Sequence, residues 1–130
     1  MKKIKFTIEY PLNKASESIL WGAIAEPLGL TEWFSDGVTV DGDEYTFSWD
    51  QHEQTAHLKQ IRQGKLIRFQ WEEDKDTDVY FQMEIIMHDI TEEVALIITD
   101  FAEPAEMDDV IMLWNKQIEN LCRKTGMEIK

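Results

Sequence analysis

Cysteine and basic residues are scarce in this chain of 130 residues. The single cysteine, Cys122, cannot form a disulfide within the chain, so nothing points to an oxidising compartment. Thirteen lysines and arginines stand against 26 aspartates and glutamates, for a formal net charge of −13. Nucleic acids and anionic membranes bind positive surfaces, and we therefore expect neither to be a main partner.

Long apolar runs and linker sequences are also missing. No segment approaches the roughly 18 apolar residues that a membrane-spanning helix needs. The first lysines resemble those of a signal peptide, but Glu9 interrupts the alternating apolar residues that follow them. No internal repeat and no low-complexity linker divides the chain. With 43% apolar residues to build a core, residues 1–130 are expected to form a single soluble domain in the cytoplasm.

The beginning of the chain predicts one strand followed by short helices. Apolar and polar residues alternate over 3–10, as in a half-buried strand, and Pro11 is expected to end it. An apolar stripe predicts a helix over 15–25. A second, short helix follows, and Gly29 is expected to weaken it.

The rest of the chain predicts an antiparallel sheet and one long helix. Alternating or continuous apolar segments indicate six further strands, at 38–40, 45–49, 54–62, 67–71, 79–87 and 94–101. The acidic segment 72–78 is expected to be a solvated hairpin loop, and an apolar stripe predicts a helix over about 104–125. Strands joined by short turns form a meander, so the expected class is α+β. We predict a curved antiparallel β-sheet of about six to seven strands wrapped around the long C-terminal helix.

Five short segments carry a resemblance to a known family. They are Glu32-Trp33-Phe34, 45–49 (Tyr-Thr-Phe-Ser-Trp), 67–71 (Ile-Arg-Phe-Gln-Trp), 99–102 (Thr-Asp-Phe-Ala) and Leu113-Trp114. With them, the chain resembles the START-like (SRPBCC, helix-grip) superfamily, most of all small bacterial START-like proteins related to the heat-shock-ATPase activator homologues. The resemblance implies a helix-grip fold with a pocket between the sheet and the last helix. It implies no catalytic set, because the superfamily carries many functions.

Two motifs look like metal sites, but one has the wrong spacing and the other has the wrong residues at two required positions. Zinc proteases place two histidines at i and i+4 on one helix face, whereas His52 and His57 lie five apart in a predicted strand. The run 74–78 (Asp-Lys-Asp-Thr-Asp) resembles a calcium loop, but Val79 and Ile85 occupy its glycine and glutamate positions. We therefore predict no metal site, no cofactor and no catalytic residue.

Two further reactive side chains have ordinary interpretations. Cys122 lies on the apolar stripe of the last helix and is expected to be a buried structural thiol. His88 and Asp89 are adjacent at the end of a predicted strand, where neighbouring side chains point to opposite faces, so we expect an ordinary surface.

Five tryptophans in 130 residues are many, and they either line a cavity or fill the core. Both alternatives stay open, because alternation shows which side of the sheet a side chain lies on but not how deeply it is buried. If a cavity exists, the candidate ligand-binding residues are those expected to face inward from the strands and the long helix. They are Phe47, Trp49, Phe69, Trp71, Phe81, Met83, Ile111, Trp114 and Ile118.

Three functions follow from these observations and the resemblance. The first is binding of a hydrophobic or amphipathic small molecule between the sheet and the last helix. The second is a protein-interaction module with a filled core, including a homodimer or a cochaperone-like role. The third is a cyclase-like or hydrolase-like enzyme, which needs ionisable groups in the pocket. Its only candidates are Tyr45, His57, Tyr80 and Asp100.

One stretch of the chain is basic and lacks acids. It holds Lys59, Arg62, Lys65 and Arg68, between two strongly acidic regions. One interpretation is a docking patch for an anion or an acidic partner. The other is that these bases pair with acids on neighbouring strands.

Overall fold

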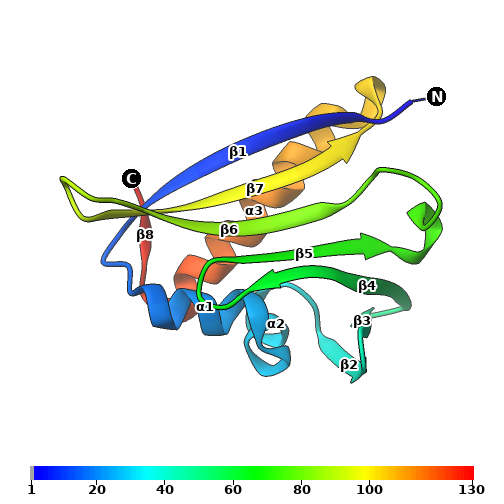
Figure 1. The fold of residues 1–130 in the computed structure, drawn as a ribbon, viewed down its shortest axis with the longest axis horizontal. Coiled ribbons are helices and arrows are strands. Elements are labelled where there is room, and N and C mark those ends of the chain that lie inside the picture. The colour runs from blue at the N-terminus through cyan, green and yellow to red at the C-terminus, as the bar shows by residue number, and fades with distance from the viewer. Residues whose placement is uncertain (1) are drawn as a thin grey trace.

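The computed structural model describes residues 2–130, whose strands form one antiparallel sheet (Figure 1). Eight strands of this part of the chain follow the order β2-β3-β4-β5-β6-β7-β1-β8. Their bounds are β1 Ile4–Asn13, β2 Gly37–Asp41, β3 Glu44–Trp49, β4 His52–Arg62, β5 Leu66–Trp71, β6 Phe81–His88, β7 Glu93–Ala102 and β8 Glu128–Ile129. Strands β2 to β7 form a meander, and β1 returns beside β7.

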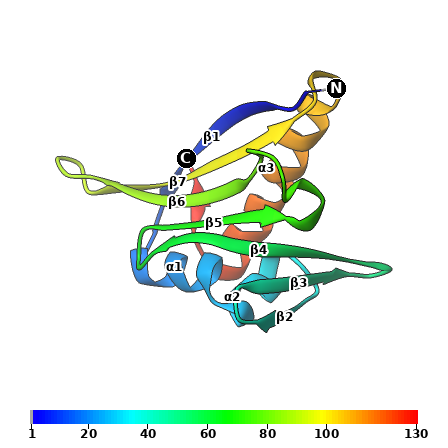
Figure 2. The same cartoon turned by 45° about the vertical axis from the view of Figure 1, so that its right-hand side comes forward.

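The helices lie on one side of this sheet, and its other side is open to solvent (Figures 1 and 2). They are α1 (Glu17–Ala25), α2 (Pro27–Trp33) and α3 (Met107–Thr125), the last preceded by a 3-10 turn. Alternate strand residues point inward, and α3 buries the stripe Trp114, Ile118, Leu121 and Cys122 against them. The predicted α+β class, a curved antiparallel sheet around a long C-terminal helix, is confirmed.

Gly29 has a packing role that its helix propensity does not reveal. A Cβ atom at this position would lie 2.0 Å from the Gly22 carbonyl oxygen and 2.8 Å from the Ala23 Cα. Only a glycine therefore allows α2 to pack so closely on α1. The structure thus gives a reason for the glycine that we expected only to weaken the helix.

Strand β1 continues through Pro11 to Asn13, so the expected break at Pro11 is wrong. The Pro11 carbonyl accepts a hydrogen bond from the Lys130 backbone N–H at 2.9 Å. The N and C=O of one strand residue face the same side, so the missing N–H faces β8, which has only two residues. Strand β8 was not predicted, because two residues are too few to show alternation.

The segment 72–78 connects β5 to β6 and is exposed, as predicted, at every position except Asp74. It begins with a 3-10 turn, Glu72–Asp74, and Asp74 is only 7% exposed. Lys3, which precedes β1, donates a hydrogen bond to the Asp74 carboxylate at 3.2 Å. This contact joins the start of the chain to the loop after β5 and closes one end of the fold.

Candidate functional site

A cleft of about 260 Å³ opens between the sheet and α3 at the end where β5 and β7 stop. We call it the aromatic cleft, because its lining residues include Phe34, Trp49, Trp71, Phe81, Phe101 and Trp114. Its polar lining consists of Lys3, Gln54, Glu73, Asp74, Asp100 and Gln117. Apolar walls with a few convergent polar groups are typical of small-molecule sites.

Alternation along the strands places the aromatic rings in these walls. Trp49 follows Phe47 on the inward face of β3, and Trp71 follows Phe69 on that of β5. The Trp49 and Trp71 ring centroids lie 6.3 Å apart, and Trp71 stacks on Phe81 at 4.9 Å. Trp114, on α3, lies 6.3 Å from Phe81. Strands and helix thus bring distant aromatic residues around one space.

Two of the indole N–H groups already have acceptors within the protein. Trp49 Nε1 donates to the Phe34 carbonyl at 3.0 Å, and Trp114 Nε1 donates to Asp100 Oδ2 at 2.8 Å. These bonds fix the orientation of both rings. The two tryptophans therefore present ring surface to the cleft, and their N–H groups are already hydrogen-bonded.

Asp100 is an acid on the inward face of β7, where the preceding inward residues are apolar. Its Oδ1 accepts from the Phe101 backbone N–H at 2.7 Å, in addition to the Trp114 bond on Oδ2. Burial raises the pKa of Asp100, whereas these two hydrogen bonds and the nearby Lys3 act in the opposite direction. The negative charge of Asp74 raises this pKa further.

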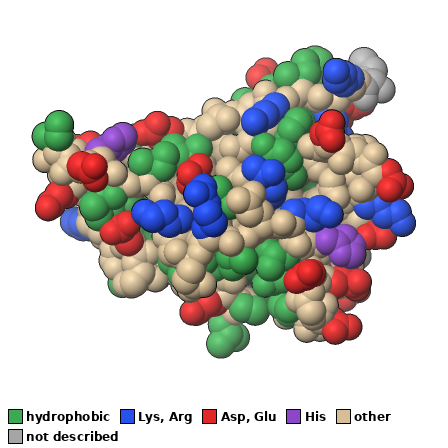
Figure 3. Space-filling model, in the orientation of Figure 1, with side chains coloured by type: hydrophobic (Ala, Val, Ile, Leu, Met, Phe, Trp, Pro, Cys, Tyr) green, Lys and Arg blue, Asp and Glu red, His purple; other side chains and the backbone are tan. Residues whose placement is uncertain are grey.

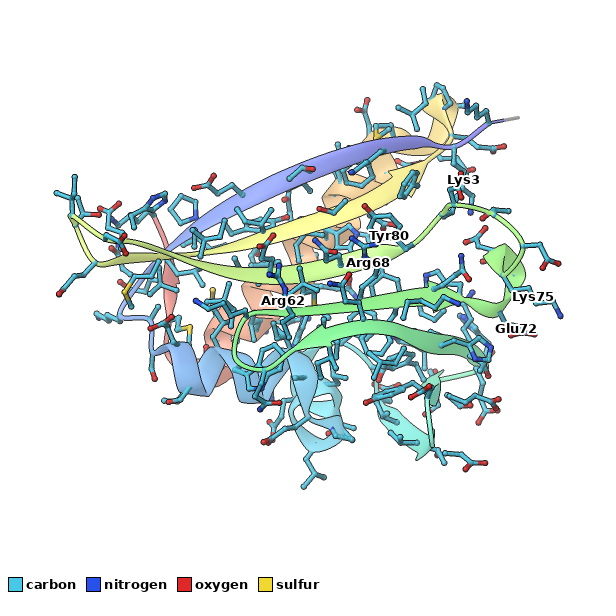
Figure 4. The ribbon with its side chains drawn as sticks, in the orientation of Figure 1. Lys3, Arg62, Arg68, Glu72, Lys75 and Tyr80 are labelled. Atoms are coloured by element: carbon cyan, nitrogen blue, oxygen red, sulfur yellow. The ribbon has the colours of Figure 1, made fainter. Side chains whose placement is uncertain are left out.

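The cleft therefore holds acids from two separate parts of the chain. Asp74 and Glu73 come from the loop after β5, and Asp100 comes from β7. Lys3, whose side chain points toward that loop in Figure 4, is the only base among the described lining residues. Its ammonium is held by Asp74, with the nitrogen 3.2 Å from the nearer carboxylate oxygen.

The structure brings together four of the nine candidate ligand-binding residues, Trp49, Trp71, Phe81 and Trp114. The other five do not line the aromatic cleft. Phe47, Phe69, Met83 and Ile118 are fully buried in the core, and Ile111 lies on α3 away from the lining. The inward-facing residues thus divide into two groups: some fill the core at the centre of the fold, and others line the cleft at one end. Ligand binding by the four lining residues stays a prediction.

Several lining residues were missed by sequence reasoning. Phe34 lies in a predicted segment, but no pattern placed it opposite the sheet. Lys3 and Asp74 are 71 residues apart, and only the tertiary structure shows their contact. For Asp100 a signal existed, since it interrupts the apolar run of β7 and was named as a candidate ionisable group.

Of the four ionisable groups considered for an enzyme, only Asp100 lines the cleft. Tyr45 is buried in the core, where desolvation raises its pKa. His57 pairs with Glu72, and Tyr80 lies against Arg68 on the outer side of the sheet. These groups therefore do not form one catalytic set.

No metal-binding group of histidine, cysteine or acidic side chains occurs within residues 2–130. His52 stacks against Trp49, with ring centroids 5.5 Å apart. His88 lies 3.8 Å from a Glu9 carboxylate oxygen on the exposed surface. Cys122 is buried, and burial raises the pKa of its thiol, with the Glu119 charge adding to the effect.

A second recess of about 420 Å³ adjoins the aromatic cleft. The two share Phe34, Trp49, Leu113 and Gln117, so they meet where the end of α2 faces α3. The recess has polar walls that include Asp36 and Lys116. A ligand longer than the cleft therefore has a polar exit along α3.

The outer side of the sheet carries the basic stretch as a band of lysine and arginine side chains (Figure 3). Arg68 stacks on Tyr80, with its guanidinium carbon 4.0 Å from the ring centroid, and its Nε donates to Gln82 Oε1 at 2.8 Å (Figure 4). Across the sheet, Arg68 faces Gln60 and Gln82 rather than acids. In the described part of the chain, none of the four bases forms an ion pair. The interpretation of cross-strand pairing with acids is therefore wrong.

No helix among residues 2–130 has the length and apolar character needed to cross a membrane. A cytoplasmic location stays a prediction.

Comparison with known proteins identifies the family. The family model of the START-like superfamily domain matches residues 1–127. The solution structure of BfR322 from Bacteroides fragilis is 38% identical, with a TM-score of 0.71, over 100% of this chain and 96% of that one. No curated protein matches the chain.

Two more distant structures share the fold. The Aha1 dimer from Colwellia psychrerythraea is 15% identical, with a TM-score of 0.71, over 93% of each chain. CalU16 from Micromonospora echinospora is 12% identical, with a TM-score of 0.74, over 95% of this chain and 76% of that one. At these identities the likeness shows the fold alone. The family match over nearly the whole length, together with the Bacteroides relative, shows that the chain belongs to the START-like superfamily.

Proposed function

We propose that this protein binds a small apolar or amphipathic molecule in the aromatic cleft. The observation that carries the proposal is the wall of Trp49, Trp71, Phe81 and Trp114 around an open space of about 260 Å³. Ring surface removed from water on binding contributes about 25 cal/mol per Å² of apolar area. The half-buried Asp100 and the amides of Gln54 and Gln117 supply the few polar groups that orient a ligand.

The size of the cleft limits the ligand. Small-molecule pockets commonly measure about 300–1,000 Å³, so this cleft is slightly smaller than the usual range. The core beneath it is filled by fully buried side chains, among them Phe47 and Phe69. A ligand with one compact apolar group therefore fits, and a longer chain has to extend into the adjoining polar recess.

Native mass spectrometry of protein purified from its own source tests the proposal. We expect a non-covalent adduct that is absent from the denatured mass. Leu113→Ala should lower the adduct-bearing fraction, because Leu113 lines the cleft. Met112→Ala is the matched control, since Met112 is its exposed neighbour on α3 and lies outside the lining. An adduct that survives Leu113→Ala unchanged, or a bare mass for the native protein, contradicts the proposal.

Docking of an acidic segment of a partner protein on the outer side of the sheet is the second candidate function. It is supported by the basic band around Arg68, whose four bases form no ion pair with an acid in the described residues. The Colwellia structure is described as a dimer, and self-association of this chain is a further form of the same candidate. The native mass spectrum also gives the oligomeric state, and an exclusively monomeric mass rules out the homodimer.

A further inference from the structure

The aromatic cleft has an excess of negative charge. Glu73, Asp74 and Asp100 line it, and Lys3 is the only base in the described lining. Lys3 is occupied by Asp74, from which its nitrogen lies 3.2 Å away. The carboxylates of Asp100 and Glu73 therefore have no cationic partner at 4 Å or less among the described residues.

The aromatic walls favour a positively charged ligand, as the carboxylates also do. The face of an indole or phenyl ring is the negative side of its quadrupole, and it attracts a cation within about 6 Å of the centroid. Trp49 and Trp71 lie at an interplanar angle of 53°, and Phe81 and Trp114 at 49°. Rings tilted in this way present surfaces of different orientation to a group in the cleft. A compact ammonium group is therefore attracted by ring faces and carboxylates together.

The charge of the whole protein acts in the same direction. A net charge of −13 lowers the local concentration of anions and raises that of cations near the surface. The first turn of α3, whose backbone N–H groups attract anions, already carries Asp108 and Asp109. A fatty acid or another anionic amphiphile would thus meet repulsion both at a distance and inside the cleft.

We propose that the ligand of the aromatic cleft is an organic cation, in which a substituted ammonium group lies against the tryptophan rings and faces Asp100 and Glu73. This inference rests on the proposed function, because it assigns a chemical class to the same ligand. A quaternary ammonium suits the cleft best. It donates no hydrogen bonds, and both oxygens of Asp100 and both oxygens of Asp74 already accept them.

Three probes of similar size and different charge test the inference. They are benzyltrimethylammonium, its uncharged isostere neopentylbenzene and the anion benzylsulfonate. Binding is measured by titration with ¹⁵N-labelled protein, following the indole N–H signals. Trp49, Trp71 and Trp114 should respond, whereas Trp21, which is buried on α1 and outside the lining, serves as the internal control. We expect the cation to bind about tenfold more tightly than the isostere, and the anion not to bind.

Three variants separate local charge from the charge of the whole protein. Glu73→Gln, at an exposed position that does not endanger folding, should weaken the cation about threefold and leave the isostere unchanged. Asp100→Asn should weaken the cation about tenfold, and more than it weakens the isostere, because an amide has one acceptor oxygen for the N–H groups of Phe101 and Trp114. Glu119→Gln removes the same charge from the exposed face of α3, outside the cleft, and should have little effect.

The possible outcomes distinguish this inference from the proposed function. Equal affinity for cation and isostere, or no effect of Glu73→Gln and Asp100→Asn, overturns the cation and leaves the cleft as a binding site for neutral molecules. Tighter binding of the anion also overturns it. If neither cation nor isostere shifts the three cleft tryptophans, the proposed function fails as well.

Discussion

At the scale of the residue, Asp100 stands where alternation requires an apolar side chain. Val94, Leu96 and Ile98 precede it on the inward face of β7 and are buried. A carboxylate at such a position loses hydration, which disfavours its charged form. Its hydrogen bonds from Trp114 and Phe101 compensate only partly, since the pKa of Asp100 remains above its ordinary value of 3.8. The charged form of Asp100 is therefore less favourable in the folded protein than in the unfolded chain, and perturbed carboxyls of this kind are common at functional sites.

The raised pKa of Asp100 makes the stability of the protein depend on pH. Between 3.8 and the higher folded-state pKa, the folded protein holds a proton that the unfolded chain releases. This contribution is therefore complete below 3.8 and is lost as the pH rises through the folded-state pKa. Relative to Asp100→Asn, the free energy of unfolding of the wild type should increase as the pH falls from 7 to 4. Urea unfolding of both proteins across this range measures the difference in the free energy of unfolding. Carboxyl groups that titrate alike in the two proteins contribute nothing to this difference. A difference that is flat or falls with acidification contradicts the burial of a titrating Asp100.

The sequence predicted which aromatic residues face inward, but not which of them meet the cleft. Trp49 and Trp71 followed from alternation and Trp114 from the helical stripe, and all three point inward. Alternation gives a face and no position along the sheet, so Phe47 and Phe69 were grouped with them although they lie in the filled core. The contact of Lys3 with Asp74 joins residues 71 apart and has no local signature.

At the scale of the element, the packing of α1 on α2 depends on the absence of one side chain. Gly29 brings the first turn of α2 against the backbone of α1 at Gly22 and Ala23. This contact fixes the end of α2, where Trp33 Nε1 donates to the Ala23 carbonyl at 2.8 Å. Phe34 follows directly and forms one wall of the aromatic cleft. The helix pair therefore positions a site residue, and local propensity could not show this.

Two glycine substitutions test this packing in opposite directions. Gly29→Ala should lower the free energy of unfolding by about 1–3 kcal/mol, because its Cβ would meet backbone atoms at 2.0 and 2.8 Å. Gly22→Ala should raise it by about 0.5–1 kcal/mol, because that Cβ has no neighbour closer than 3.6 Å and alanine favours the helix. Urea unfolding monitored by tryptophan fluorescence gives both values. A neutral Gly29→Ala would show that the helices do not pack this closely.

At the scale of the whole molecule, charge is distributed very unevenly. Residues 15–58 contain no lysine or arginine, while the basic stretch crosses the outer side of the sheet without acid partners in the described residues (Figure 3). The meander of strands predicted from the sequence is confirmed, because short turns leave few alternative strand orders. The position of β1 between β7 and β8 was beyond the sequence pattern, since it depends on pairing between the two ends of the chain.

An excess of negative charge predicts that added salt stabilises this protein. Repulsion among the acids destabilises the compact state, and the screening length falls from about 30 Å at 0.01 M to about 10 Å at 0.1 M salt. The urea midpoint should therefore rise as NaCl increases over this range. The double variant Asp76→Asn/Asp78→Asn removes two exposed acids from the loop after β5 and should make the rise shallower. Lys59→Gln/Lys65→Gln removes two exposed bases and should make it steeper. If salt instead lowers the midpoint, attraction between the unlike charges of the folded protein outweighs their repulsion, and the basic band contributes to stability rather than standing free for a partner.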